Sequence, residues 1–315
     1  SFGIQLDQAD KNTIAYSKIL GDRKIPLTQR QHGIDLWESD DNEIYENQIQ
    51  FVNDGIYIER SHYNLVRDNQ VSYARYGYHL MFTKYSTLTQ NKSSKNISGM
   101  MVMGTEGTTV THNQLFDNKR HVQSLGLLLF DVKNAIVTEN DIINNRVGVF
   151  IENAKHNEVT HNLIQGNYIG IRFKFATENH IHQNAFIANV VQGQAENSDQ
   201  NDVNQNYWAD HLGLDLDGDQ LSNIAYEVDP FFLKITDDYP PFQLLFQAPG
   251  MIFLESLIDI SDQEKLIDRS PLLLNPISNG DDSTSSQLPV FLLSLGLLLI
   301  SLLIMYMGVK VNEKI

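Results

Sequence analysis

Short runs of alternating apolar and polar residues recur along the chain at a fixed interval up to residue 206. The recurring motif is an asparagine, one residue, an aliphatic residue, two residues and a second asparagine. Clear copies are NEIYEN (42–47), NLVRDN (64–69), NEVTHN (157–162), NHIHQN (179–184) and NDVNQN (201–206), and weaker copies are STLTQN (86–91), TTVTHN (108–113) and AIVTEN (135–140). No part of the repeat has the period of a helix, so each unit predicts short strands separated by turns.

Two columns of residues fix the register of this repeat. The asparagine that closes each motif recurs every 22 residues, with one interval of 27; these residues are Asn47, Asn69, Asn91, Asn113, Asn140, Asn162, Asn184 and Asn206. A glycine follows most of them after eight residues, at Gly55, Gly77, Gly99, Gly148 and Gly170, while Gly126 comes five residues late in the long interval. Gly33 and Gly3 extend the column backwards, across an insertion near residues 21–28. Because both columns place the insertion in the same unit, they describe one repeat.

A unit of 22 residues cannot bury its own apolar face, so the units must stack on one another. Three short strands per unit predict an all-β fold, a parallel β-helix over residues 1–208, and the general rule for parallel crossovers makes it right-handed. The closing asparagines then form a ladder of amides bonded along the stack. The glycine column marks a corner that needs positive φ or a close backbone approach. Both columns are structural.

Alternation along the strand after each column glycine separates inward from outward side chains. Positions one and three after the glycine are apolar and are predicted to face inward: Ile34/Leu36, Ile56/Ile58, Tyr78/Leu80, Met100/Val102, Leu127/Leu129, Val149/Ile151 and Ile171/Phe173. Positions two and four are predicted to face outward: Asp35/Trp37, Tyr57/Glu59, His79/Met81, Met101/Met103, Leu128/Phe130, Phe150/Glu152 and Arg172/Lys174.

Two adjacent units place four soft or borderline metal donors on the outward face. Rungs lie ~4.8 Å apart and alternate residues ~6.6 Å apart, so His79, Met81, Met101 and Met103 should form one small square. Thioethers with an imidazole favour Cu(I), which makes the square a candidate copper contact.

The alternative for the same residues is a docking surface, because methionine is common at adaptable binding surfaces. The two interpretations are compatible. Neighbouring outward residues are apolar as well and predict a partner surface: Trp37, Tyr57, Leu128, Phe130 and Phe150.

The repeat stops after Asn206, and residues 209–278 are expected to form a cap that closes the open core, followed by a docking appendage. DLDGD places carboxylates at alternate positions, Asp215, Asp217 and Asp219, as a calcium loop does. A cap turn is favoured over calcium, because Gln220 and Tyr226 stand where the calcium loop needs Gly and Glu.

The C-terminal end predicts a membrane anchor. Residues 279–287 (NGDDSTSSQ) read as a flexible polar linker. The next 22 residues, 288–309, carry no charge and can span a hydrocarbon core of ~30 Å as a helix; a buried core helix is the weaker alternative. Lys310 and Lys314 favour a cytoplasmic tail at 310–315, so the rest of the chain should be extracytoplasmic, in the periplasm or on the outer face of the cytoplasmic membrane.

The composition of the 315 residues excludes several classes of function. The net charge of −16 argues against nucleic-acid binding, and the absence of cysteine excludes disulfides, iron–sulfur clusters and thiol chemistry. The chain begins with serine and shows no signal-like leader, so we expect that a leader has been removed or that the sequence is a fragment. His180 and His182 flank inward Ile181 with no obvious partner across the rungs, and they are expected to be surface residues.

Three features together resemble one family: the asparagine-ended units, GYHLMFT (77–83) with MVMGT (101–105) one unit later, and the closing NYWADHLGLDLDGDQLSNIAYEVDP (206–230) with SPLLLNP (270–276). They resemble NosD, the periplasmic β-helix accessory proteins of nitrous oxide reductase maturation, over about residues 10–277. Such proteins usually carry more N-terminal coils, and the predicted membrane helix is an addition to soluble relatives.

The resemblance implies a non-catalytic role. The protein would work with an ABC transporter, made of an ATPase and a membrane dimer, and with a copper chaperone, to deliver copper to the copper-sulfide site of nitrous oxide reductase. The chain has no G-x-x-x-x-G-K-[ST] loop, so ATP hydrolysis would come from the partner ATPase. The family's H-x-M with M one coil later carries over to His79, Met81 and Met103, while Met101 is added from the strand geometry alone.

Two other functions stay open. β-Helices often act on uronans, and Glu152 beside Arg172 and Lys174 is a candidate patch for a polysaccharide-binding or polysaccharide-cleaving protein, although a solvated surface is favoured there. The second alternative is a structural surface solenoid.

Overall fold

The computed structural model describes residues 3–228 and 266–277. The predicted linker (279–287), membrane helix (288–309) and tail (310–315) lie outside these residues, as does most of the predicted appendage. Within the two described ranges, no helix combines the length and hydropathy that a membrane crossing requires.

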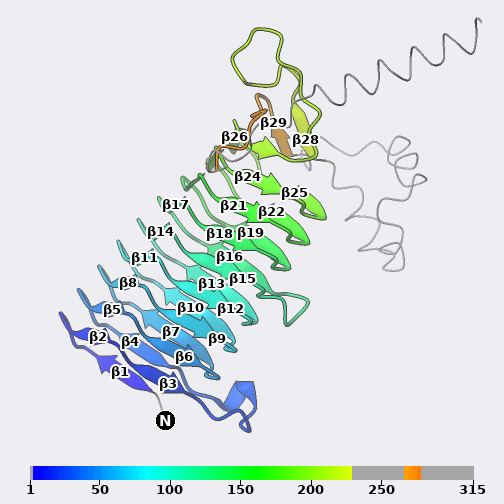
Figure 1. Ribbon diagram of the computed structural model, residues 1–315. Helices are drawn as coiled ribbons and strands as arrows, with labels where there is room; N and C mark the ends of the chain where they lie inside the picture. The colour runs from blue at the N-terminus through cyan, green and yellow to red at the C-terminus, as the bar shows by residue number, and fades with distance from the viewer. Residues whose placement is uncertain (1–2, 229–265, 278–315) are drawn as a thin grey trace, which may run out of the picture. The chain divides into compact units, whose positions relative to one another are not determined.

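Within the described residues the chain winds into three parallel sheets of nine strands each, so that each coil contributes one strand to every sheet (Figure 1). The first sheet contains β1 (Ile4–Asp7), β4 (Ile34–Trp37), β7 (Asp54–Glu59), β10 (Tyr76–Met81), β13 (Ser98–Met103), β16 (Leu125–Phe130), β19 (Val147–Glu152), β22 (Ile169–Lys174) and β25 (Val191–Glu196). The second contains β2 (Thr13–Ala15), β5 (Glu43–Tyr45), β8 (Leu65–Arg67), β11 (Thr87–Thr89), β14 (Thr109–Thr111), β17 (Ile136–Thr138), β20 (Glu158–Thr160), β23 (His180–His182) and β26 (Asp202–Asn204). The third contains β3 (Lys18–Leu20), β6 (Gln48–Gln50), β9 (Gln70–Ser72), β12 (Lys92–Ser94), β15 (Gln114–Phe116), β18 (Asp141–Ile143), β21 (Leu163–Gln165), β24 (Ala185–Ile187) and β27 (Tyr207–Trp208). The predicted parallel β-solenoid with coils of about 22 residues is confirmed.

The register follows the two sequence columns. Tyr78 pairs with Met100, 22 residues later, and Met100 pairs with Leu127 across the longer coil. Near the N-terminus Ile4 pairs with Ile34, because the predicted insertion forms an excursion that holds the short 3₁₀ helix η1 (Leu27–Gln29). Both insertions therefore leave the stacked strands and do not disturb the register.

The core is built from the predicted inward residues. All fourteen side chains at positions one and three after the column glycines are 0% exposed, from Ile34 to Phe173. The buried hydroxyl of Tyr78 donates to the carbonyl of Asn69 at 2.8 Å, which satisfies the one polar group among them. Met100 is therefore a core residue.

The closing asparagines form the predicted ladder. In each step the backbone N–H of one asparagine donates to Oδ1 of the next, as from Asn69 to Asn91 at 3.0 Å, and the side-chain amide donates to the same oxygen at 3.1 Å. A second ladder, which the motif did not predict, runs through Asn96, Asn118, Asn145, Asn167 and Asn189.

Close approach, and not positive φ, explains the glycine column. A Cβ on Gly77 would lie 2.5 Å from the carbonyl oxygen of Gly99, and Gly99 and Gly126 repeat this relation. Positive φ falls instead on the residue before each ladder asparagine, such as Asp68 (57°) and Gln90 (56°).

The last coil is covered by the cap. Trp208 is buried and stacks between Phe186 (ring centroids 4.2 Å apart) and Tyr226 (4.7 Å). Tyr226 belongs to β28 (Tyr226–Val228), which pairs antiparallel with β29 (Leu266–Asp268). The apolar core thus ends under an aromatic stack and a two-stranded sheet.

Candidate functional site

The outward face of the first sheet brings the four candidate copper donors together. His79 lies directly opposite Met101, and Met81 opposite Met103, on the paired strands β10 and β13. On its other side β10 pairs with β7, which places Tyr57 opposite His79 and Glu59 opposite Met81. The predicted square is therefore present in the strand register.

The square is less exposed than outward positions suggest. His79 is 6% exposed and Met101 7%, while Met81 and Met103 are half-buried. The ring centroid of His79 lies 4.9 Å from that of Tyr57 and 5.1 Å from that of Tyr76, so aromatic neighbours cover the imidazole. His79 and Met101 therefore lie at the predicted outward positions but are buried there, whereas Tyr57, Phe150 and Arg172 at the same position of other strands are half-buried.

A buried carboxylate that the sequence analysis did not identify holds His79. The Oδ2 atom of Asp54 lies 2.8 Å from Nδ1 of His79, and Asp54 itself is 0% exposed. Arg75 donates two hydrogen bonds to the same carboxylate, at 2.8 and 2.7 Å. Burial alone would raise the pKa of Asp54, but the hydrogen bonds from His79 and Arg75 lower it overall, so the carboxylate is ionised.

This arrangement fixes the orientation of the imidazole. An ionised carboxylate accepts a hydrogen bond, so in the neutral ring the proton lies on Nδ1 and the lone pair on Nε2. Nε2 of His79 is buried and has no hydrogen-bond partner within the described residues. Metal-ligating histidines characteristically donate their other nitrogen to a carboxylate in this way. The residues present therefore fit a metal ion at Nε2.

Tyr57 connects the imidazole to the thioethers. Its hydroxyl is hydrogen-bonded to the carboxylate of Glu59 and lies 3.4 Å from Sδ of Met81. Its ring stacks on His32, with centroids 4.7 Å apart. Burial first, and then Glu59, raise the pKa of Tyr57 well above its ordinary value, so the phenol keeps its proton.

A signal for Asp54 was present in the sequence. On the first sheet Asp54 aligns with Tyr76 and then Ser98, and the same column continues through Leu125 and Val147. An acid at the start of a strand in an otherwise uncharged column indicates that the acid has specific hydrogen-bond partners. Arg75, one residue before Tyr76, is one of the partners of Asp54.

Two residues of the predicted partner surface, Leu128 and Phe150, line a groove. Leu128 is buried, and Trp37, Tyr57, Phe130 and Phe150 are half-buried. A groove of about 410 Å³ lies over Met101, Leu128 and Phe150, and the loop at His121–Gln123 from the longer coil borders it. The groove therefore begins at one of the four candidate donors.

The positive charges of the candidate polysaccharide patch (Glu152, Arg172 and Lys174) are paired with a carboxylate outside the patch. Glu196, on the next coil, lies 3.5 Å from the guanidinium of Arg172 and 3.1 Å from the ammonium of Lys174. These groups are partly exposed, so the patch has the character of a solvated ion-pair cluster.

The DLDGD segment has the geometry of a turn. The Asp215 carboxylate accepts backbone N–H groups from Asp217 (3.2 Å), Gly218 (2.6 Å) and Gln220 (3.1 Å). The bond from Gly218, followed by the other backbone bonds, lowers the pKa of Asp215. Its oxygens thus serve the turn, although carboxylate oxygens of Asp215, Asp217 and Asp219 lie within 4.8 Å of one another.

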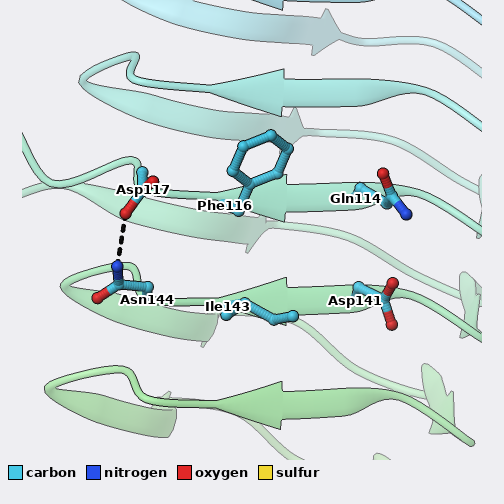
Figure 2. Close-up of a pocket in the computed structure, with 6 residues that line it drawn as sticks. All are labelled: Gln114, Phe116, Asp117, Asp141, Ile143 and Asn144. Atoms are coloured by element: carbon cyan, nitrogen blue, oxygen red, sulfur yellow. Dashed lines mark hydrogen bonds between the residues drawn. The ribbon is translucent and has the colours of Figure 1, made fainter.

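A shallow hollow of about 310 Å³ lies on the third sheet, on β15 and β18. Figure 2 shows Phe116 and Ile143 on these two neighbouring strands, where they are paired, and Asn144 bonded to Asp117 at the end of the strands. Asn144 donates to Asp117 at 2.5 Å. The remaining lining residues, Gln114 and Asp141, are ordinary strand residues, and the hollow brings together no acid–base or metal-binding set.

Comparisons with known proteins agree with the fold and identify one family. The model of a family described as periplasmic copper-binding protein (NosD) matches residues 8–213. No curated protein matches the chain.

Two solved structures align with part of the chain. The periplasmic alginate epimerase AlgG aligns with a TM-score of 0.51 at 17% identity, over 56% of this chain and 47% of that one. The mannuronan C-5 epimerase AlgE6 A-module of Azotobacter vinelandii aligns with a TM-score of 0.45 at 12% identity, over 65% of this chain and 68% of that one. The chain thus spans about half the length of AlgG, and the likeness shows the fold alone.

Proposed function

Since the chain belongs to the NosD family of periplasmic copper-binding proteins, we propose that it is a non-catalytic accessory protein that handles copper outside the cytoplasm during maturation of nitrous oxide reductase. Its partners would be a copper chaperone, the reductase, and an ABC transporter whose ATPase supplies the energy. A membrane helix at residues 288–309 would anchor it. Copper is cargo in this proposal, held transiently and passed on.

The observation that carries the proposal is the buried, unpartnered Nε2 of His79 within the described residues, beside thioethers on the same and the next strand. A buried polar atom without a partner costs about 1–3 kcal/mol, which a ligand at that atom would recover. Imidazole with thioether sulfur is a donor set that selects Cu(I) over Zn²⁺, Mg²⁺ or Ca²⁺. His79 would bind through Nε2, with sulfur supplied by Met81, Met101 and Met103.

The surrounding residues support temporary binding. Asp54 would hold the imidazole in place before copper arrives, so little ordering is needed on binding. Met81 and Met103 are half-buried and so can be reached by a partner protein. The groove over Met101, Leu128 and Phe150 is apolar on this side and is bordered by polar residues such as Glu152 and Arg172, so a chaperone or the reductase would dock there beside the donors.

The test is a Cu(I) titration of the full chain against a competing chelator. The variant Met81→Leu/Met101→Leu/Met103→Leu keeps apolar bulk but removes the sulfurs, and the matched control is Met100→Leu, which changes the inward methionine of the same strand. We expect stoichiometric binding by the wild type and the control and its loss in the triple variant. Equal Cu(I) binding by all three proteins, or binding by none of them, would refute copper contact through this face. If the protein bound neither copper nor a partner protein, a purely structural solenoid would be favoured.

A second candidate, action on a polysaccharide, is favoured by one observation on the same face. Burial first, and then Glu59, raise the pKa of Asp35 to about 6, and Tyr57 lies on the next strand in register with Asp35. A carboxyl group with a pKa near neutrality beside a phenol is a candidate acid–base pair. Incubation with alginate, followed by NMR for C-5 inversion or new unsaturated ends, would reveal such an activity, and Asp35→Asn should abolish it. Unchanged alginate would exclude this substrate.

A further inference from the structure

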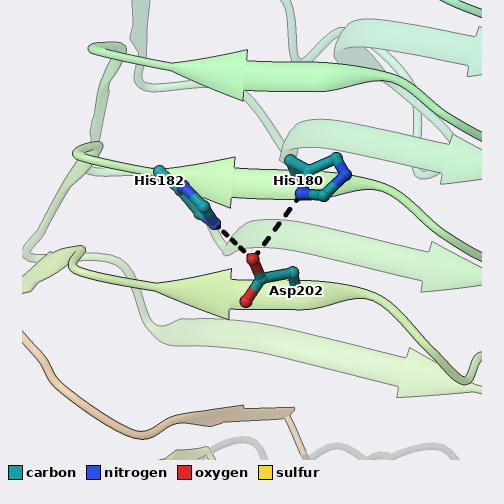
Figure 3. A group of neighbouring side chains, drawn as sticks. All are labelled: His180, His182 and Asp202. Atoms are coloured by element: carbon teal, nitrogen blue, oxygen red, sulfur yellow. Dashed lines mark hydrogen bonds and ion pairs between the residues drawn. The ribbon is translucent and has the colours of Figure 1, made fainter.

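Two histidines and an aspartate meet on the outer face of the second sheet (Figure 3). They lie on β23 and β26, far along the stack from the coils that carry the copper donors. Nε2 of His182 lies 2.9 Å from Oδ2 of Asp202, and Nδ1 of His180 lies 3.6 Å from the same oxygen. The sequence analysis expected no partner across the rungs for these histidines, and that expectation is wrong: parallel register places Asp202 of β26 directly opposite His180 of β23.

The fold arranges the three residues in advance. Ile181 is 0% exposed, so the strand turns His180 and His182 to the same outer face. The two strands are tied together at both ends by asparagines, because Asn179 donates to Asn201 at 2.8 Å and Asn184 to Asn206 at 3.0 Å. The backbone positions of the three side chains are therefore set by the solenoid.

We propose that His180, His182 and Asp202 form a binding site for a divalent transition-metal ion of the zinc class. One ligand atom from each residue lies within 4.8 Å of the other two. Ligand atoms that share a zinc ion at about 2.0–2.2 Å lie roughly 3–3.5 Å apart. The two imidazole nitrogens lie 2.9 and 3.6 Å from Oδ2 of Asp202, close to that spacing. The side chains are exposed or half-buried, so small rotations complete the set and a fourth position stays open to water.

The donor chemistry separates this site from the others in the chain. Two imidazole nitrogens and one carboxylate oxygen suit Zn²⁺, Ni²⁺ or Cu²⁺, whereas the thioether-rich face suits Cu(I). The Asp215, Asp217 and Asp219 group offers only carboxylates, which suit Ca²⁺. This proposal therefore stands independently of the proposed function.

The chain supplies matched controls. His112 lies 2.6 Å from Glu139, and His156 lies 3.2 Å from Glu178, and each pair joins neighbouring coils on an exposed surface. Each pair has one imidazole and one carboxylate but lacks a second histidine. If an exposed His–acid pair were sufficient to bind metal, these sites would behave like the proposed one.

The experiment is a Zn²⁺ titration of the full chain against a chromogenic chelator. Wild type is compared with His182→Ala and Asp202→Asn, and with the controls His112→Ala and His156→Ala. We expect one tight site, weakened about tenfold or more in the first two variants and unchanged in the controls and in excess Ca²⁺. In NMR spectra Zn²⁺ should shift the ring signals of His180 and His182 first.

Three results would overturn the proposal. They are wild-type binding no tighter than that of His182→Ala, an equal loss in the two control variants, or displacement of Zn²⁺ by excess Ca²⁺. Thermal melting of each variant without metal checks the fold, and the NMR measurement on wild type decides the question without any substitution.

Discussion

Asp268 ends the asparagine ladder by accepting hydrogen bonds from Asn206, 62 residues earlier in the chain. The backbone N–H of Asn206 donates to Oδ2 at 2.8 Å and its side-chain amide at 3.2 Å, in the places that the next asparagine would occupy. Nε1 of Trp208 donates to the same oxygen at 3.0 Å. One fully buried carboxylate thus closes the last open rung of the solenoid and holds the cap on it.

Replacing Asp268 by alanine should destabilise the C-terminal end of the solenoid. The change leaves buried N–H groups of Asn206 and Trp208 without an acceptor, and we expect a loss of about 2–4 kcal/mol in the free energy of unfolding. Urea denaturation followed by tryptophan fluorescence measures it, because Trp208 lies under the cap and is bonded to Asp268. Asp199→Ala, which removes an exposed carboxylate near the same end, is the control. Equal midpoints for the two variants would contradict the closing role of Asp268.

The sequence predicted the solenoid well because its constraints repeat. An asparagine such as Asn91 makes the same bonds in every coil, and a glycine such as Gly77 meets the same neighbouring carbonyl, so each column reports one physical requirement many times. The residues at positions one and three after each column glycine are buried in every coil, because each coil stacks its apolar side on the next. Register and insertions followed directly from the columns.

Features that occur once could not be predicted in this way. Asp268 lies outside the repeat, and nothing in the sequence around it shows that it accepts the ladder bonds of Asn206, 62 residues earlier. The bond between Asp54 and His79 joins neighbouring coils at different strand positions, so alternation does not reveal it. The burial of His79 depends on the rings of Tyr57 and Tyr76, which pattern analysis treats as separate outward residues.

Asp54 should be a positioning residue for the proposed copper contact. Asp54→Asn keeps the size of the side chain but removes the charge that fixes Nδ1–H of His79, and we expect Cu(I) affinity to fall about 10–100-fold. Competition titration measures the affinity, and Asp35→Asn, on the same face without a hydrogen bond to His79, serves as the control.

His79→Gln separates orientation from ligation. It should weaken Cu(I) binding at least as much as Asp54→Asn, because it removes the ligand itself. If the Asp54→Asn variant bound Cu(I) as tightly as the wild type and the His79→Gln variant did not, the carboxylate of Asp54 would have no part in positioning the imidazole. Melting temperatures of the metal-free variants exclude unfolding as the cause, since Arg75 also loses a charged partner.

The raised pKa of Asp35 predicts a defined pH dependence. In the folded protein its pKa is about 6, against 3.8 for the unperturbed group, so between these values the folded state binds more protons than the unfolded state. The contribution of Asp35 to the free energy of unfolding therefore increases as the pH falls from about 6 to about 4, and it is least favourable above pH 6. Asp35→Asn should be about 1–2 kcal/mol more stable than wild type at neutral pH and nearly equal at about pH 4, allowing for partial solvent screening. Urea titrations across this range would contradict the assignment if the difference between the two proteins did not change with pH.

Gly77→Ala tests the cause of the glycine column. A Cβ at Gly77 would lie 2.2 Å from Oγ of Ser93 and 2.5 Å from the carbonyl oxygen of Gly99, so the coils must separate locally, and we expect a cost of about 3 kcal/mol or more. Gly166→Ala is the matched control, because Gly166 has φ of +65° but no atom closer than 4.0 Å to its added Cβ. That change should cost only about 1 kcal/mol, the penalty of the left-handed backbone alone. Urea denaturation of both variants decides between the two explanations: a larger loss for Gly166→Ala would mean that backbone conformation, and not the contact between coils, is what the solenoid requires of its glycines.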